Sequence, residues 1–141
     1  GLDLEAFSSS KKLSKSEIIR RHSKPMYTVF FIGFLPGFLY LGGLDLGLSL
    51  DRKTTPSLNV KKGSVAIGGQ QTGIYPQDSP GGWHCIGNSP VELFNSNKNP
   101  PCTIKAGDRV KFVPIKKAEH DDLLHLIKMS EYQLKSIYTN A

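Results

Sequence analysis

Residues 68–83 have the sequence GGQQTGIYPQDSPGGW, which departs from what an ordinary strand or helix requires. Five of these sixteen residues are glycine and two are proline. We therefore expect a backbone steered through positive or fixed φ angles rather than a regular ladder. Side-chain amides, a hydroxyl and two large rings alternate with the glycines, as in loops that present hydrogen bonds and flat apolar faces to a ligand. The alternative is a turn-rich connection within a β-barrel.

Short strand-like segments flank this run, each bounded by glycine, proline or asparagine. They lie at 58–60, 64–67, 83–87 and 109–114. Many short strands at such spacing predict a mainly β fold, either a barrel or a sandwich. Residues 90–94 could form a helical turn or a strand, and 95–101 are expected to be a surface loop.

Two apolar segments precede these strands. Residues 26–34 are rich in aromatic and β-branched side chains, which predicts a strand buried on both faces. Residues 34–43 are interrupted by Pro-Gly and Gly-Gly, so neither a helix nor a plain strand is expected there. This segment could be a plug that closes one end of a barrel, or an apolar wall of a pocket, and the two are compatible.

Each end of the chain carries a helix pattern. Ser14 and Glu17 fit a capping box, which predicts a short helix over about residues 14–22 that ends at His22. The more polar residues before it contain a linker-like run of three serines. Apolar residues near a 3.6-residue period predict an amphipathic helix over 117–138. Its apolar stripe could cover the barrel or pack against a partner protein.

Composition limits the class of protein. The 141 residues are 38% apolar and 21% charged, as expected of one globular domain. The net charge of +6 is scattered and does not form the continuous basic face of a nucleic-acid module. No apolar stretch approaches the length of a membrane span. The N-terminus lacks the succession of basic, apolar and small residues that is typical of a signal peptide. We therefore expect a cytoplasmic protein that binds neither nucleic acid nor membrane.

The two cysteines, Cys85 and Cys102, match no metal motif. We interpret both as buried or half-buried thiols and expect no metal site. Cys85 follows His84 directly, which raises the possibility of a nucleophilic pair. Adjacent residues on a strand point to opposite faces, so this interpretation is disfavoured.

Four motifs together resemble one known family. They are GFLPGFLYL (33–41), GSVAIGGQQTGIYP (63–76), SPGGW (79–83) and GDRVKF (107–112). In this order they are similar to the B subunit of bacterial 5-oxoprolinase, to the sporulation kinase inhibitor KipI and to allophanate hydrolase subunit 1. The resemblance covers about residues 2–115. It implies a cyclophilin-like β-barrel over 25–115, with 1–24 left from a preceding α+β domain and 116–141 as a C-terminal helix without a family counterpart.

The resemblance also implies a function. It points to ATP-dependent opening of the lactam 5-oxoproline to glutamate by a complex that includes a homologous C subunit and a separate A subunit. ATP and magnesium would belong to that complex, because this chain has no phosphate-binding loop ending in Lys-Ser/Thr and no acidic pair suited to magnesium. The alternatives are a non-catalytic inhibitor of a histidine kinase and a carboxyltransferase or allophanate hydrolase component of urea degradation.

A pocket for such a lactam needs amide or hydroxyl partners, an apolar floor and a cation. We predict that substrate is bound by Phe34, Pro36, Gly37, Phe38, Gln70, Gln71, Thr72, Gly73, Tyr75, Gly82 and Trp83. His22 and His84 are the catalytic candidates, and these two with Arg52 and Arg109 are the candidate cations. Three of them also have a structural interpretation, which we favour: His22 as a residue at a helix end, His84 as a hydrogen-bonded strand residue and Arg109 as a surface strand residue. Family members commonly carry arginine at the positions of Ser57 and Asn88. The loss of both arginines would weaken an anion-binding site in this chain.

Overall fold

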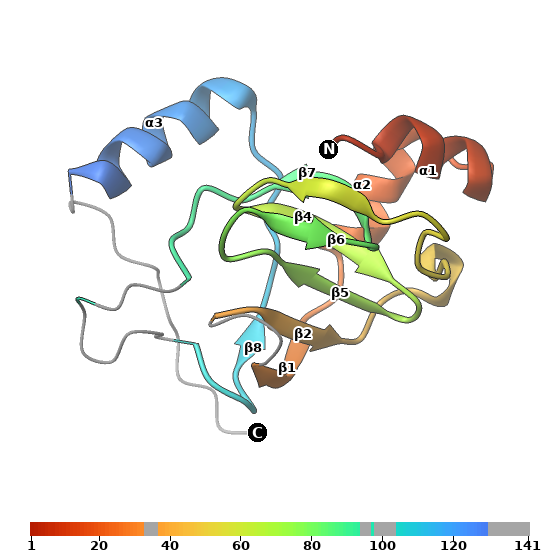
Figure 1. Cartoon of the computed structure of the whole chain (residues 1–141), viewed down its shortest axis with the longest axis horizontal. Helices are drawn as coiled ribbons and strands as arrows, with labels where there is room; N and C mark the ends of the chain where they lie inside the picture. Colours follow the sequence, from red (N-terminus) through yellow and green to blue (C-terminus); the bar gives the residue numbers. More distant parts are fainter. Residues whose placement is uncertain (33–36, 94–96, 98–103, 130–141) are drawn as a thin grey trace.

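Residues 1–32, 37–93, 97 and 104–129 are described in a computed structural model of the chain (Figure 1). A six-stranded antiparallel sheet has the order β7-β4-β5-β2-β1-β8, and β3 pairs with β6 in a second, two-stranded sheet. The strands are β1 Tyr27–Ile32, β2 Leu39–Gly42, β3 Ser57–Val60, β4 Ser64–Gly68, β5 Gln71–Ile74, β6 Ser79–Gly81, β7 His84–Asn88 and β8 Arg109–Val110. The prediction of a mainly β fold with a short N-terminal helix and a C-terminal helix is confirmed.

Two helices, not one, precede the sheet. The predicted helix is α2, Lys15–Ser23, and Ser14 Oγ accepts a hydrogen bond from the Glu17 amide as the capping box requires. The helix α1, Leu4–Lys11, occupies the residues that we interpreted as linker-like. Its buried Phe7 packs in the main core, so tertiary packing outweighs the weak helix preference of the three serines.

The strand prediction fails in two places. Residues 39–42 form β2, a regular strand between β1 and β5, where we expected no plain strand. Gly42 at its end is tolerated because the Phe30 ring lies against it and fills the place of a side chain. Phe30 is 58% exposed, so β1 is not buried on both faces.

The glycine-rich run is also more regular than we predicted. It contains β5 and β6, both paired in antiparallel ladders. By contrast, β8 is shorter than the predicted 109–114, and residues 91–93 form neither the helical turn nor the strand considered for them. The expected loop at 95–101 lies outside the described residues, apart from residue 97.

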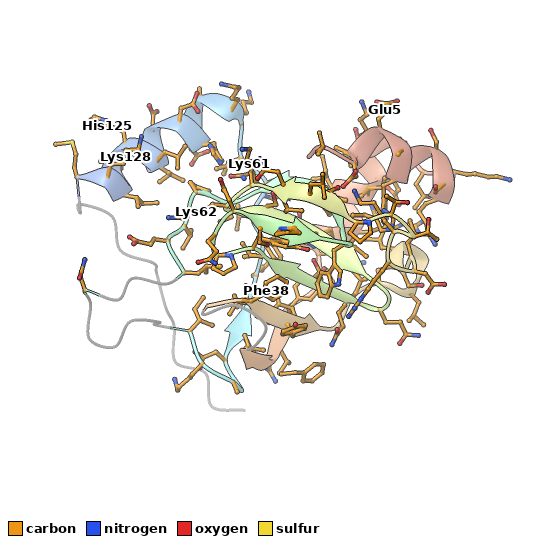
Figure 2. All side chains as sticks on the ribbon, viewed as in Figure 1. Glu5, Phe38, Lys61, Lys62, His125 and Lys128 are labelled. Carbon is orange, nitrogen blue, oxygen red and sulfur yellow. The ribbon has the colours of Figure 1, made fainter. Side chains whose placement is uncertain are left out.

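The C-terminal helix is α3, Lys117–Lys128, and the rest of the predicted helix lies outside the described residues. None of its residues is buried, and its aliphatic side chains, Leu123, Leu124, Leu126 and Ile127, are mostly half-buried. His125 and Lys128, labelled in Figure 2, are on its exposed side. In Figure 1 this helix projects from the sheets on the side opposite α1.

Candidate functional site

Four aromatic side chains form one cluster, which we call the aromatic cluster: Phe38, Tyr40, Tyr75 and Trp83. All of them except Tyr40 were predicted to bind substrate. The Phe38 ring (labelled in Figure 2) lies 5.0 Å from both tyrosine rings and 5.6 Å from the Trp83 ring, measured between centroids. Phe38 and Tyr75 are each 2% exposed and Trp83 is 5% exposed. The rings therefore belong to a second core and contact one another in edge-on or tilted geometry.

The glycines of residues 68–83 make room for these rings. A Cβ at Gly68 would meet the Trp83 indole, and one at Gly81 would meet the Tyr75 phenol. At Gly73, a Cβ would collide with the carbonyl oxygen of Leu39 on the neighbouring strand. Among the five glycines of this run, only Gly69 has a positive φ, of 62°. Close ring and strand packing, more than unusual backbone angles, accounts for the composition of the run.

Two predicted site residues that are 50 positions apart meet in the interior. The Nε2 atom of His22, at the end of α2, lies 2.8 Å from Oγ1 of Thr72 on β5. The Thr72 hydroxyl donates to the Ala66 carbonyl oxygen at 2.9 Å. Because a hydroxyl has one proton to donate, Nε2 of His22 must be the donor, which leaves Nδ1 unprotonated. This arrangement is compatible with a structural role for His22.

Burial governs the chemistry of these interior groups. It lowers the pKa of His22 to about 4, so the ring is neutral near pH 7. Burial also raises the pKa of the Cys85 thiol, which opposes formation of a nucleophilic thiolate. His84 Nε2 instead contacts the Asp51 carbonyl oxygen at 2.7 Å. The disfavoured Cys-His nucleophile gains no support from this geometry, and Cys102 lies outside the described residues.

The two predicted amide side chains are the accessible part of the site. Gln70 is exposed at the turn between β4 and β5, and Gln71 is half-exposed at the start of β5. Gln70 lines a shallow hollow of about 270 Å³ with Gly69 and residues 49–51. The exposed Arg52 follows this hollow in sequence and lies near Gly82. We call Asp51, Arg52, Gln70 and Gln71 the polar rim.

Two further predicted residues, Gly37 and Arg109, lie away from the rim. Gly37 has a positive φ of 82° and is buried before β2. Arg109 is exposed on β8, which pairs with β1 at the far edge of the sheet. Phe34 and Pro36 lie outside the described residues. The structure thus divides our predicted site into a buried aromatic scaffold and a small accessible rim.

An ion pair that sequence patterns did not reveal supports β7. Asp3 Oδ2 accepts from the Cys85 amide at 2.8 Å, and Lys53 Nζ reaches Asp3 Oδ1 at 3.0 Å and Ser57 Oγ at 2.6 Å. The sequence around Asp3 gave no sign of this contact, because its partners lie 50 and 82 residues away. Ser57 therefore has a structural partner in the Lys53 side chain.

A second hollow, which we call the groove, contains one predicted residue, His22. It has a volume of about 610 Å³ and lies between α2, the β4–β7 edge and residues 112–121. Asn88 also lines the groove, and the Oδ1 atom of Asn88 accepts a hydrogen bond from His120 Nε2 on α3 at 2.8 Å. No sequence motif pointed to this groove, because its walls come from distant parts of the chain.

No three histidine, cysteine, aspartate or glutamate side chains in the described part of the chain are arranged to hold a metal ion. None of the described helices is long and apolar enough to span a membrane.

Known proteins resemble this chain closely. A family model described as carboxyltransferase domain, subdomain C and D, matches residues 1–104. The 5-oxoprolinase B subunit of Haemophilus influenzae is 49% identical over 113 residues, which are 80% of this chain and 53% of that protein. The corresponding Bacillus subtilis protein is 43% identical over 120 residues, 85% of this chain and 50% of that protein.

A solved structure agrees with these sequence matches. The crystal structure of a conserved uncharacterized protein from Pyrococcus horikoshii superposes with a TM-score of 0.81 at 49% identity. The match covers 85% of this chain and 56% of that one. The chain therefore spans about half the length of the curated relatives that it matches.

Proposed function

The chain belongs to the carboxyltransferase domain family, subdomain C and D, and from this premise we propose that it is part of the B subunit of a 5-oxoprolinase. The observation that carries the proposal is its 43% to 49% identity, over 113 residues or more, to proteins that bear that name. The longer protein would act in the cytoplasm with a homologous C subunit and a separate A subunit. That complex would use ATP and magnesium to convert 5-oxoproline to glutamate.

The polar rim is the part of this chain that we assign to the shared active site. A primary amide both donates and accepts hydrogen bonds, so Gln70 and Gln71 suit the N–H and C=O of a lactam. The exposed guanidinium of Arg52 suits its carboxylate. The buried aromatic cluster would hold the β4–β5 turn in place, because its rings pack directly on Gly68 and Gly73.

The experiment combines the full-length protein with its C and A subunits, and measures glutamate formed from 5-oxoproline and ATP. We expect turnover only in the complete mixture. Gln70→Ala and Gln71→Ala should each lower kcat/KM about 10-fold or more, since one lost hydrogen bond in a specific site is worth about 1.5 kcal/mol. Gln77→Ala is the matched control, because Gln77 is an exposed glutamine outside the rim.

Two outcomes separate the parts of this proposal. No glutamate from a complete mixture of folded subunits would reject the oxoprolinase function. Normal turnover by both rim variants would reject the site while leaving the function intact. The family description also names a carboxyltransferase domain, so carboxyl transfer to urea in a biotin-dependent assay is the second activity to measure. Binding to a histidine kinase without turnover would favour the inhibitor function.

A further inference from the structure

The groove has an apolar floor that the rim and its proposed function do not use. Its apolar lining comes from α2, β4, β7 and the segment that follows β8. The residues are Ile19, Val65, Ile86, Phe112 and Ile115. The groove and the polar rim share no residue. Its volume of about 610 Å³ lies within the range typical of small-molecule pockets, about 300–1,000 Å³.

The groove is lined by a buried ring with one nitrogen that lacks a partner. His22 is 5% exposed and lines the groove, and its Nε2 is bound to Thr72. Nδ1 makes no hydrogen bond to any of the described residues. In the same part of the chain, no fully buried side-chain nitrogen or oxygen lacks a partner, so Nδ1 must retain some access to solvent. The His22 ring packs against the ring of Phe112, another residue that lines the groove, with 4.6 Å between centroids, so we take the groove to be where Nδ1 meets solvent.

Several other polar side chains at the groove already have partners. Asn88 accepts from His120, and its own amide group donates to the Lys62 carbonyl oxygen at 3.1 Å. Lys117 Nζ is paired with Asp121 Oδ2 at 3.2 Å. Among the described side chains of the groove, His22 Nδ1 is the buried acceptor without a partner, whereas Ser23 is half-buried and Asp121 is exposed.

We propose that the groove binds a small, uncharged ligand that has an apolar ring and one N–H or O–H donor, and that this donor binds Nδ1 of His22. The apolar floor supplies affinity through the area that it removes from water. The buried acceptor supplies specificity, because an unpaired acceptor in an apolar setting favours a ligand that satisfies it. Phenol-like and indole-like compounds have this chemistry.

The test compares phenol with anisole, which has a similar shape but no hydroxyl proton. Each is titrated into the full-length protein labelled with 15N-histidine, and NMR follows the ring nitrogens of His22. We expect phenol to bind about 5-fold more tightly than anisole, the effect of one neutral hydrogen bond of about 1 kcal/mol. The Nδ1 resonance should shift with phenol and not with anisole.

His22→Gln is the informative variant, because the glutamine amide nitrogen can replace Nε2 as the donor to Thr72 while Nδ1 is lost. In this variant the preference for phenol should fall to about 1-fold. Ile115→Ala is the matched control and should weaken both compounds equally. If the variant does not fold, the wild-type resonance alone decides the question. Absence of saturable binding, equal affinities in the wild type or a preference that survives His22→Gln would each overturn the proposal.

Discussion

At the scale of single residues, the glycines of 68–83 have different roles that the sequence alone did not separate. Gly68 lies beneath the Trp83 indole, whereas a Cβ at Gly69 would have nothing within 4 Å. Gly69 is instead required by its φ of 62° at the turn between β4 and β5. The sequence indicated backbone freedom throughout the run because glycine composition does not distinguish a turn from a close ring contact.

This difference predicts unequal effects of alanine at the two adjacent positions. Gly68→Ala should lower the free energy of unfolding by about 2–3 kcal/mol, because the new methyl group displaces the buried indole. Gly69→Ala should lower it by about 1 kcal/mol, the cost of a left-handed backbone with a side chain. Urea denaturation of both variants measures the two values. Equal losses would show that the Trp83 ring does not confine Gly68.

His22 predicts how stability depends on pH. Its folded pKa of about 4 lies below the ordinary value of 6.5, so the unfolded chain gains a proton that the folded chain excludes. Stability is therefore complete above pH 6.5 and falls as the pH is lowered toward 4. The loss should reach about 3 kcal/mol, since one pKa unit corresponds to about 1.4 kcal/mol. Denaturant titrations at a series of pH values measure it.

The control for this prediction is again His22→Gln, which has no titratable ring but can keep the bond to Thr72. Its stability should change much less than that of the wild type between pH 6.5 and 4. Glu17, whose pKa is lowered to about 2 by hydrogen bonds from Arg20 and Arg21, acts mainly below pH 4.5. Equal slopes for variant and wild type across the His22 range would assign the effect to other groups.

At the scale of elements, local patterns predicted the structure where they agreed with packing. The capping box located α2, and alternation of strand formers with turns located β4 and β7. The strands β5 and β6 were missed, because their glycines and proline disfavour strands in isolation. Their pairing depends on neighbours that lie elsewhere in the chain. The same reason applies to the site, since the contact of His22 with Thr72 requires the folded sheet.

The helix α3 should be the least stable of the described helices. It has no buried residue, and its described tie to the sheet includes the bond between His120 and Asn88. His120→Ala should therefore speed amide exchange in residues 117–128 about 5-fold, if the bond contributes about 1 kcal/mol. Hydrogen exchange with mass spectrometry measures this change.

The exchange experiment has a matched control at the other end of α3. His125→Ala removes an exposed histidine whose side chain makes no hydrogen bond to any of the described residues. Amide exchange in α3 should then change only by the small difference in helix preference. Similar acceleration in both variants would show that the bond to Asn88 does not hold the helix.

At the scale of the whole molecule, the first 24 residues share a core with the sheet. Phe7 of α1 and Ile18 of α2 are buried in the same cluster as Val29, Leu39 and Ile67. Our sequence-based domain boundary placed residues 1–24 outside the β domain at 25–115, and that boundary remains a prediction. The packing suggests that the helices and the sheet fold as one cooperative unit.

Deletion of residues 1–24 tests whether the helices and the sheet fold as one cooperative unit. It would expose the surfaces that Phe7 and Ile18 cover, each of which contributes about 2–3 kcal/mol of burial. It would also remove Asp3 from Lys53 and from the Cys85 amide. The combined loss of about 5 kcal/mol or more is comparable to the whole stability of a small domain, about 5–15 kcal/mol.

We therefore expect residues 25–141 alone to lack a cooperative thermal transition and near-ultraviolet circular dichroism from Trp83. A sharp transition in the shortened chain would instead support an independent domain that begins at residue 25.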